Sequence, residues 1–328
     1  MKRGTVICVA ESWAAAAYLR ALAEGWLGQS PDFEWCLLPT DRVCAAFSEM
    51  PVGTHTVNGD GDFSSRLAQA CDRPGPKVLL VSASGSKTEF AVVDGARSSG
   101  LPVLQYIDTW YNYRRRLQAD DRLVLGDRIL VIDDCAAAEA ADEGLPRSLL
   151  VAVGHPVWQR CQPLPPSPTR SLLFVGAPVQ REYGMTLGYT ERHAWSILKS
   201  ALDAFPGLFD DISYAPHPDD ADALRIDGVK VVRYRPEMLS SVDTVVGMFS
   251  APLIDAFLAR RRAVTLQPNA TSYDMCPLSR HGRIPRTTTV DGLMAALRAT
   301  PPSPALLAHS LTGSQRRITA EIEKALPA

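Results

Sequence analysis

Residues 158–170 read WQRCQPLPPSPTR, and this proline-rich stretch separates two halves of the chain that share one pattern. Proline cannot continue a helix and is excluded from central strands, so the segment is interpreted as a linker. A chain of 328 residues is too long for one ordinary core and fits two domains. The predicted domains are residues 1–160 and 170–311, followed by a C-terminal helix over residues 312–328 that is expected to cross back to the first domain.

Short apolar runs alternate with amphipathic stretches on both sides of the linker. The runs are rich in Val, Leu and Ile, which is typical of parallel strands buried on both faces. The strands expected from them are Thr5–Ala10, Phe33–Pro39, Lys77–Ala83, Val103–Thr109, Arg128–Asp133, Leu149–Gly154, Leu172–Gly176, Ile212–Ala215, Val229–Tyr234, Thr244–Phe249 and Ala263–Gln267. The helices expected between them are Ser12–Leu27, Lys87–Ser99, Cys135–Glu143, Thr190–Ala204, Pro252–Ala259, Asp291–Ala299 and Thr312–Leu326. This alternation predicts two Rossmann-like α/β domains, with ligand at the carboxyl ends of the strands in a cleft between the domains.

The charge balance argues against nucleic acid as a partner. The formal net charge is −2, and the part before residue 165 carries 16 basic and 20 acidic residues, against 18 and 16 after it. Neither half has the basic excess of a nucleic-acid binder. The seven scattered cysteines include no CxxC pair, so they are interpreted as reduced and structural, and no zinc site is expected. No apolar run is long enough for a membrane span, which predicts a cytoplasmic protein and leaves open a peripheral association with the inner membrane.

A serine follows the fourth strand expected after the linker, in the string GMFSAPL (247–253). Ser250 is a good N-cap and Pro252 suits a first helical turn. A helix that starts at the end of a parallel strand offers backbone N–H groups and a positive dipole end to an anion. We therefore expect Ser250 and Ala251 to bind phosphate, and the alternative is that Ser250 only caps its helix.

A histidine stands between two prolines at the end of another expected strand, in SYAPHP (213–218). The prolines fix the local backbone and hold the imidazole of His217 at the edge of the sheet, where it could donate to a phosphate. The alternative is an ordinary surface histidine. His155 and His193 also fall near strand ends, and both are interpreted as structural.

Together, PHP and GMFSAPL resemble the HP and serine motifs of bacterial GT-B sialyltransferases and of the related Kdo-transferring enzymes. The resemblance implies that His217 and Ser250 hold the nucleotide phosphate of a CMP-activated sugar, and that the turn at Glu237 lies beside the nucleotide base. Those enzymes often have two adjacent serines where this chain has Ser250-Ala251, so the phosphate contact here depends on one hydroxyl and on backbone amides. The donor-binding residues expected on these grounds are Gly176, His217, Pro218, Glu237, Ser250 and Ala251, with His217 also counted as catalytic.

The string QYIDTWYNYRRR (105–116) is the candidate acceptor site. A sugar acceptor needs flat apolar faces, an anionic one needs arginines, and an inverting transfer needs a carboxylate base. Asp108 is the expected base, and the acceptor contacts are expected from Trp110, Tyr111 and Arg114. Two alternatives stay open: Asp108 caps a helix, or the base lies in the loop NGDGD (58–62), which contains Asp60 and Asp62.

The leading hypothesis is therefore an inverting GT-B glycosyltransferase of polysaccharide biosynthesis. It would move a sialic acid-like or Kdo-like sugar from a CMP donor to a glycan or protein acceptor, with no bound cofactor and no metal. The alternatives are a transferase that uses a nucleotide diphosphate sugar, a sugar-nucleotide epimerase or hydrolase, and a non-catalytic nucleotide-sugar-binding protein.

Overall fold

The computed structural model describes residues 4–26, 33–39, 43, 54–56, 63–218, 226 and 228–326. Two compact units make up the chain. Unit 1 comprises residues 1–160 and 309–328, and unit 2 comprises residues 161–308. None of the helices within the described ranges is long and apolar enough to span a membrane.

Unit 1 is built on a parallel sheet with the strand order β3-β2-β1-β4-β5-β8-β9. Its strands are β1 (Gly4–Ala10), β2 (Phe33–Pro39), β3 (Thr54–Thr56), β4 (Lys77–Ser82), β5 (Val103–Tyr106), β8 (Arg128–Val131) and β9 (Leu150–Ala152), and β6 (Gln118–Ala119) and β7 (Arg122–Leu123) form a separate hairpin. Its helices are α1 (Trp13–Gly25), α2 (Phe63–Cys71), α3 (Lys87–Ser98), α4 (Tyr113–Arg116), α5 (Asp134–Asp142) and α12 (Ser314–Ala325).

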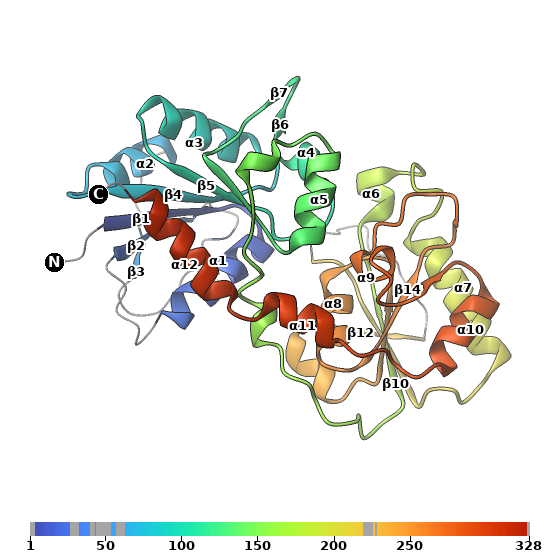
Figure 1. Cartoon of the computed structure of the whole chain (residues 1–328). Coiled ribbons are helices and arrows are strands. Elements are labelled where there is room, and N and C mark those ends of the chain that lie inside the picture. The colour runs from blue at the N-terminus through green and yellow to red at the C-terminus, as the bar shows by residue number, and fades with distance from the viewer. Residues whose placement is uncertain are drawn as a thin grey trace. The chain divides into compact units, whose positions relative to one another are not determined.

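The sheet of unit 1 is buried on both faces because its side chains alternate between two apolar clusters. Val6 and Cys8 of β1 belong to the cluster that includes residues of α1 and α12, whereas Ile7 and Val9 belong to the cluster that includes residues of α2 and α3. This is the two-residue period of a strand with helices on each side. Figure 1 shows α2 and α3 on one side of the sheet and α1 and α12 on the other.

The C-terminal helix α12 packs on unit 1, as the sequence predicted. Ile318 and Ile322 are fully buried in the cluster that also contains residues of α1. The indole N–H of Trp26 donates to Thr319 Oγ1 at 2.7 Å, and the amide of Gln315 donates to the carbonyl of Leu22 at 3.3 Å. The chain therefore returns to its first unit after completing the second.

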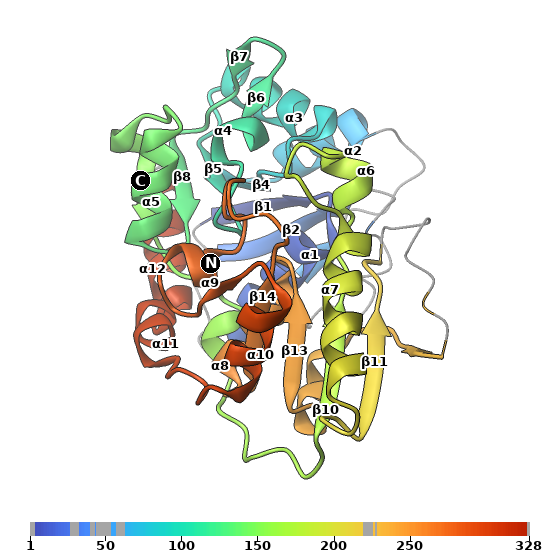
Figure 2. The same cartoon turned by 90° about the vertical axis from the view of Figure 1, so that its right-hand side faces the viewer.

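Unit 2 contains a parallel sheet with the order β12-β11-β10-β13-β14-β15. Its strands are β10 (Ser171–Val175), β11 (Asp211–Ala215), β12 (Lys230–Val231), β13 (Thr244–Gly247), β14 (Arg262–Leu266) and β15 (Arg286–Thr287). Its helices are α6 (Val179–Tyr183), α7 (Glu191–Ala204), α8 (Ala251–Leu258), α9 (Pro277–Arg280) and α10 (Val290–Arg298), with a 3-10 turn η4 (Pro236–Ser240), and α11 (Ala305–Leu311) includes the boundary to unit 1. Figure 2 shows β13, β10 and β11 side by side.

The two parallel sheets, each with its helices, confirm the predicted α/β fold class. Three strands are much shorter than predicted. Val229–Tyr234 forms only Lys230–Val231, an edge strand paired with β11, and Val103–Thr109 and Leu149–Gly154 are reduced to Val103–Tyr106 and Leu150–Ala152. Helix α2 was not predicted: its apolar stripe is only two turns long, and of its members Phe63, Leu67, Ala70 and Cys71 only Ala70 is fully buried.

Candidate functional site

Three of the predicted donor residues meet at the carboxyl ends of neighbouring strands in unit 2. Gly176 follows β10, His217 follows β11 and Ser250 follows β13. The hydroxyl of Ser250 donates to the carbonyl of Gly176 at 2.8 Å. A Cβ placed on Gly176 would lie 3.4 Å from the backbone nitrogen of His217 and 3.0 Å from Tyr214 Oη, so the backbone passes closely here.

Ser250 is the N-cap residue of α8, but its side chain does not cap the helix. Its hydroxyl is instead turned to Gly176, as the bond above shows. Ala251 is exposed at the first helical position, and Pro252 follows it. The start of α8 therefore lacks the usual side-chain acceptor from its cap, which is the arrangement expected of a helix end that receives an anion.

Two more of the predicted donor residues lie in exposed segments of unit 2. Pro218 is exposed beside His217, and Glu237 is exposed in the first turn of η4. The turn that precedes η4 is tied to α8, because Tyr234 Oη donates to Asp255 Oδ2 at 2.8 Å. Burial and the neighbouring Asp255 raise the pKa of Tyr234, so this phenol stays a hydrogen-bond donor. The predicted position of Glu237 beside the nucleotide base stays a prediction.

A polar network that the sequence analysis did not select lies at the end of β14. Gln267 is fully buried; its amide oxygen accepts from Tyr189 Oη at 3.2 Å, and its amide nitrogen donates to Asp274 Oδ1 at 2.6 Å. The guanidinium of Arg286 donates to the carbonyls of Asn269 and Ser272, both at 2.8 Å. The loop after β14 is thus held firmly on the same edge as Ser250. Its signal in the sequence was the polar string QPNATSYD (267–274) directly after an apolar run.

In unit 1, Asp108 lies two residues beyond the end of β5, with 13% of its side chain exposed. Its carboxylate is 3.6 Å from Arg116 Nη1, and the same nitrogen donates to the carbonyl of Ala83 at 3.1 Å. The N-cap of α4 is Asn112, so Asp108 does not cap that helix. The carboxylate also adds to the effect of burial in raising the pKa of Tyr106. Asp108 therefore stays a candidate base at the carboxyl edge of the sheet.

The predicted acceptor residues differ in their surroundings. Tyr111 is half-buried with Arg116 over its ring, 5.6 Å from the ring centre, and Arg114 is exposed and donates to Gln118 Oε1 at 3.0 Å. Trp110 is a correction, because only 1% of it is exposed. Its indole N–H donates to Asp133 Oδ1 at 2.9 Å and its ring stacks on Trp158, with 5.2 Å between the ring centres. Trp110 is therefore a core side chain of unit 1, and we leave it out of the proposed acceptor site.

The competing carboxylates of unit 1 are also placed. Asp133 caps α5 by accepting from the backbone N–H of Ala136 at 2.8 Å. Asp94 pairs with Arg122 on the surface. Asp60 and Asp62 lie outside the described residues.

A buried glutamate that the sequence analysis did not select lies beside this edge. Glu89 is 2% exposed and accepts hydrogen bonds from the Ser82 hydroxyl and from both the N–H and the hydroxyl of Ser84, the last two at 2.7 Å. Burial raises the pKa of Glu89, and the carboxylate of Glu11 adds to the rise. The hydrogen bonds from Ser82 and Ser84 lower the pKa but do not cancel the effect of burial. Glu11 follows the end of β1, so a second carboxylate stands on the same edge as Asp108.

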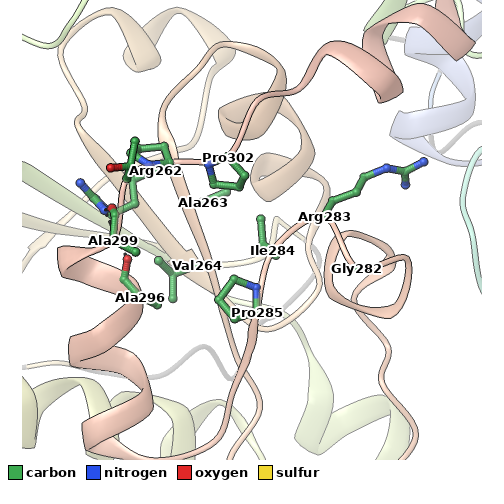
Figure 3. A pocket seen from close by; sticks show the side chains of 12 residues that line it. Arg262, Ala263, Val264, Gly282, Arg283, Ile284, Pro285, Ala296, Ala299 and Pro302 are labelled. Carbon is green, nitrogen blue, oxygen red and sulfur yellow. Dashed lines mark hydrogen bonds between the residues drawn. The ribbon is translucent and has the colours of Figure 1, made fainter.

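A separate cavity of about 330 Å³ lies elsewhere in unit 2. It is lined by Arg262 at the start of β14, by residues 282–285 before β15 and by the end of α10. Figure 3 shows the side chain of Arg283 extended away from the other lining side chains. The cavity is at the amino ends of the strands, on the edge opposite to Gly176 and Ser250, so it is distinct from the candidate donor site.

Comparison with known proteins gives a fold but no family. No model of a protein family matches the chain, and a search of curated proteins finds no match. Solved structures do match. UDP-GlcNAc 2-epimerase from Neisseria meningitidis, bound to UDP-GlcNAc, superposes with a TM-score of 0.64 and 11% identity over 98% of this chain and 100% of that one. The S. aureus MnaA–UDP structure superposes with a TM-score of 0.63 and 13% identity over 99% of this chain and 96% of that one.

The glycotransferase of kitacinnamycin gives a TM-score of 0.60 and 14% identity over the full length of both chains. The chain has the two-domain GT-B fold. The predicted fold class is therefore confirmed over the whole length of these proteins. The finer resemblance to CMP-dependent transferases stays a prediction.

Proposed function

We propose that the chain is a glycosyltransferase that binds a nucleotide sugar at the carboxyl edge of the unit 2 sheet. The observation that carries the proposal is the start of α8. Ser250 occupies the cap position without capping, and its hydroxyl reaches the close turn at Gly176, which lies against the backbone of His217. Phosphate oxygens would accept from the amides of α8, from His217, and from the Ser250 hydroxyl once it turns from the carbonyl of Gly176 to the ligand. Asp108 would take the proton of the acceptor hydroxyl.

The sequence motifs favour a CMP donor that carries an acidic sugar, since a monophosphate leaving group can be stabilised by protein donors alone. The similar solved structures favour a uridine nucleotide, because two of them contain UDP or UDP-GlcNAc. The donor is a co-substrate in both cases, so the proposal needs no resident cofactor. The acceptor would be a glycan or a protein, met in the cytoplasm during polysaccharide assembly.

The test is a thermal-shift panel with CMP, CDP, UDP and GDP. A ligand that binds the folded chain raises its melting temperature in proportion to the logarithm of concentration over Kd. Ser250→Ala and His217→Ala should each weaken nucleotide binding about ten- to a hundredfold, the usual effect of losing one hydrogen bond to a charged group. Ser200→Ala removes an exposed hydroxyl of α7, which donates to the carbonyl of Ser196, and is the matched control. Wild-type nucleotide affinity in both site variants would remove these residues from the proposal.

A second candidate function is epimerisation of the nucleotide sugar, which the similarity to UDP-GlcNAc 2-epimerases favours. An epimerase breaks and remakes a C–H bond of the sugar and needs no acceptor. Incubation of the nucleotide sugar alone in D₂O distinguishes the two functions: deuterium in the recovered sugar supports the epimerase, and its absence together with transfer to an acceptor supports the transferase.

A further inference from the structure

A fully buried glutamine in unit 2 has every hydrogen-bonding position of its side chain occupied. The amide oxygen of Gln267 accepts from Tyr189 Oη at 3.2 Å and from the backbone N–H of Met275 at 3.3 Å. Its amide nitrogen donates to Asp274 Oδ1 at 2.6 Å and to Thr265 Oγ1 at 3.1 Å. A primary amide has two acceptor and two donor positions, so all four are used. Because a backbone N–H only donates and an ionised carboxylate only accepts, the amide is held in one orientation.

One of these bonds leads to the start of α8. The hydroxyl of Thr265 donates in turn to the carbonyl of Met248 at 2.6 Å, and both residues are fully buried. Met248 follows the end of β13 directly and stands two residues before Ser250, the cap residue of α8. A single hydroxyl therefore connects the amide of Gln267 to the stretch of backbone that carries Ser250.

Another of these bonds leads to the segment between β10 and α7. Tyr189 is fully buried at the end of this segment, and Gly176, at its beginning, accepts from the hydroxyl of Ser250 at 2.8 Å. The side-chain amide of Asn269 also donates to the carbonyl of Leu187 at 3.3 Å, so the loop after β14 contacts this segment a second time. The contacts therefore lead from Ser250 back to Ser250. We call this set the Gln267 network, and its members are Ser250, Gly176, Tyr189, Gln267, Thr265 and Met248.

A buried network with all its hydrogen bonds made favours one arrangement of the segments that it joins, because other arrangements leave buried polar groups without partners. Backbone amides bind an anion more tightly when they are already in place, since ordering them on binding costs free energy. We infer that Gln267 is a positioning residue, which through Thr265 and Tyr189 holds the start of α8 and the Gly176 turn in the arrangement that receives a phosphate. The inference rests on the proposed function for the identity of the ligand. Gln267 itself is fully buried and acts only through these neighbours.

Two matched threonine variants of the full chain test the inference. Thr265→Val keeps the size of the side chain and removes the hydroxyl that links Gln267 to Met248. Thr244→Val is the control, because Thr244 is also fully buried and its hydroxyl donates to Asp243 Oδ2 at 2.7 Å, at the opposite end of β13. Both variants should melt below wild type. Only Thr265→Val should bind nucleotide more weakly, by about three- to tenfold, the usual effect of losing one neutral hydrogen bond.

The affinity is measured by titration calorimetry with CMP, CDP, UDP and GDP, at a temperature where every variant is folded. A hydroxyl with a structural role alone would lower the melting temperature and leave the Kd of the folded chain unchanged. Gln267→Met removes all four side-chain bonds and should weaken nucleotide binding more than Thr265→Val does. If Gln267→Met does not fold, the comparison of Thr265→Val with Thr244→Val still decides the inference.

Hydrogen–deuterium exchange without nucleotide gives a second measurement, at residues 249–258 and 268–275. Both segments should exchange faster in Thr265→Val than in Thr244→Val. The inference is overturned if Thr265→Val binds nucleotide as wild type does, or if residues 249–258 exchange equally in the two threonine variants. A wild type that binds none of the four nucleotides refutes the proposed function. In that case the exchange comparison alone decides whether the Gln267 network holds the start of α8: faster exchange in Thr265→Val supports the inference, and equal exchange overturns it.

Discussion

Acid should destabilise unit 1 through a single histidine. His155 is 5% exposed, its ring stacks on Trp158 with 3.9 Å between the ring centres, and its Nδ1 accepts from the backbone N–H of Trp158 at 3.4 Å. Burial lowers the pKa of His155 from 6.5 to about 3. The unfolded chain then binds the proton more readily between these two values, so stability falls as the pH drops through this window. At about 1.36 kcal/mol per pKa unit, the loss relative to pH 8 is about 2 kcal/mol at pH 5 and about 3 kcal/mol at pH 4.

The assay is urea unfolding followed by tryptophan fluorescence at pH 8, 6, 5 and 4. Five of the six tryptophans belong to unit 1, so the signal reports mainly on that unit. His155→Phe keeps a flat ring against Trp158 but cannot bind a proton, and it removes the effects of all other titrating groups from the comparison. The unfolding free energy of wild type minus that of His155→Phe should fall by about 2 kcal/mol from pH 8 to pH 5. Parallel pH profiles in the two proteins would refute the reasoning.

Two further predictions concern the proposed reaction. Asp108→Asn should lower turnover about a hundred- to ten-thousandfold while nucleotide affinity stays at the wild-type value, because the amide cannot take the acceptor proton; wild-type turnover in this variant would return the search for the base to Glu11 and to the loop that contains Asp60. Transfer should survive EDTA, since helix amides and His217 are proposed to stabilise the leaving phosphate, and a loss of activity restored by Mg²⁺ or Mn²⁺ would instead indicate a diphosphate donor.

The strand ends could be predicted from the sequence because apolar runs and their flanking turns are local signals. Gly176, His217 and Ser250 were selected on that basis, and the structure places them at neighbouring strand ends. What the sequence did not show was the direction of the Ser250 hydroxyl. Its acceptor, the carbonyl of Gly176, is 74 residues away along the chain. Local pattern alone predicts a cap at such a serine.

The acceptor side was predicted less well, for a related reason. A cluster of aromatic residues after a strand looks the same in sequence whether the rings face solvent or core. Trp110 is buried because Asp133 and Trp158 approach it from later segments of the chain. Whether a side chain is buried by distant segments of the chain can be read from the folded structure but not from the local sequence.

The return of α12 to unit 1 has a consequence for synthesis on the ribosome. Unit 2 is translated in full before residues 309–328 of unit 1 emerge. Domains generally fold as units, in the order in which they are made. Here unit 2 can fold first. Unit 1 cannot complete its core until Ile318 and Ile322, which are fully buried in it, have been synthesised. A message that stops shortly after codon 308 would therefore yield a complete unit 2 attached to a unit 1 with open apolar surface, a product suited to capture by chaperones and proteases.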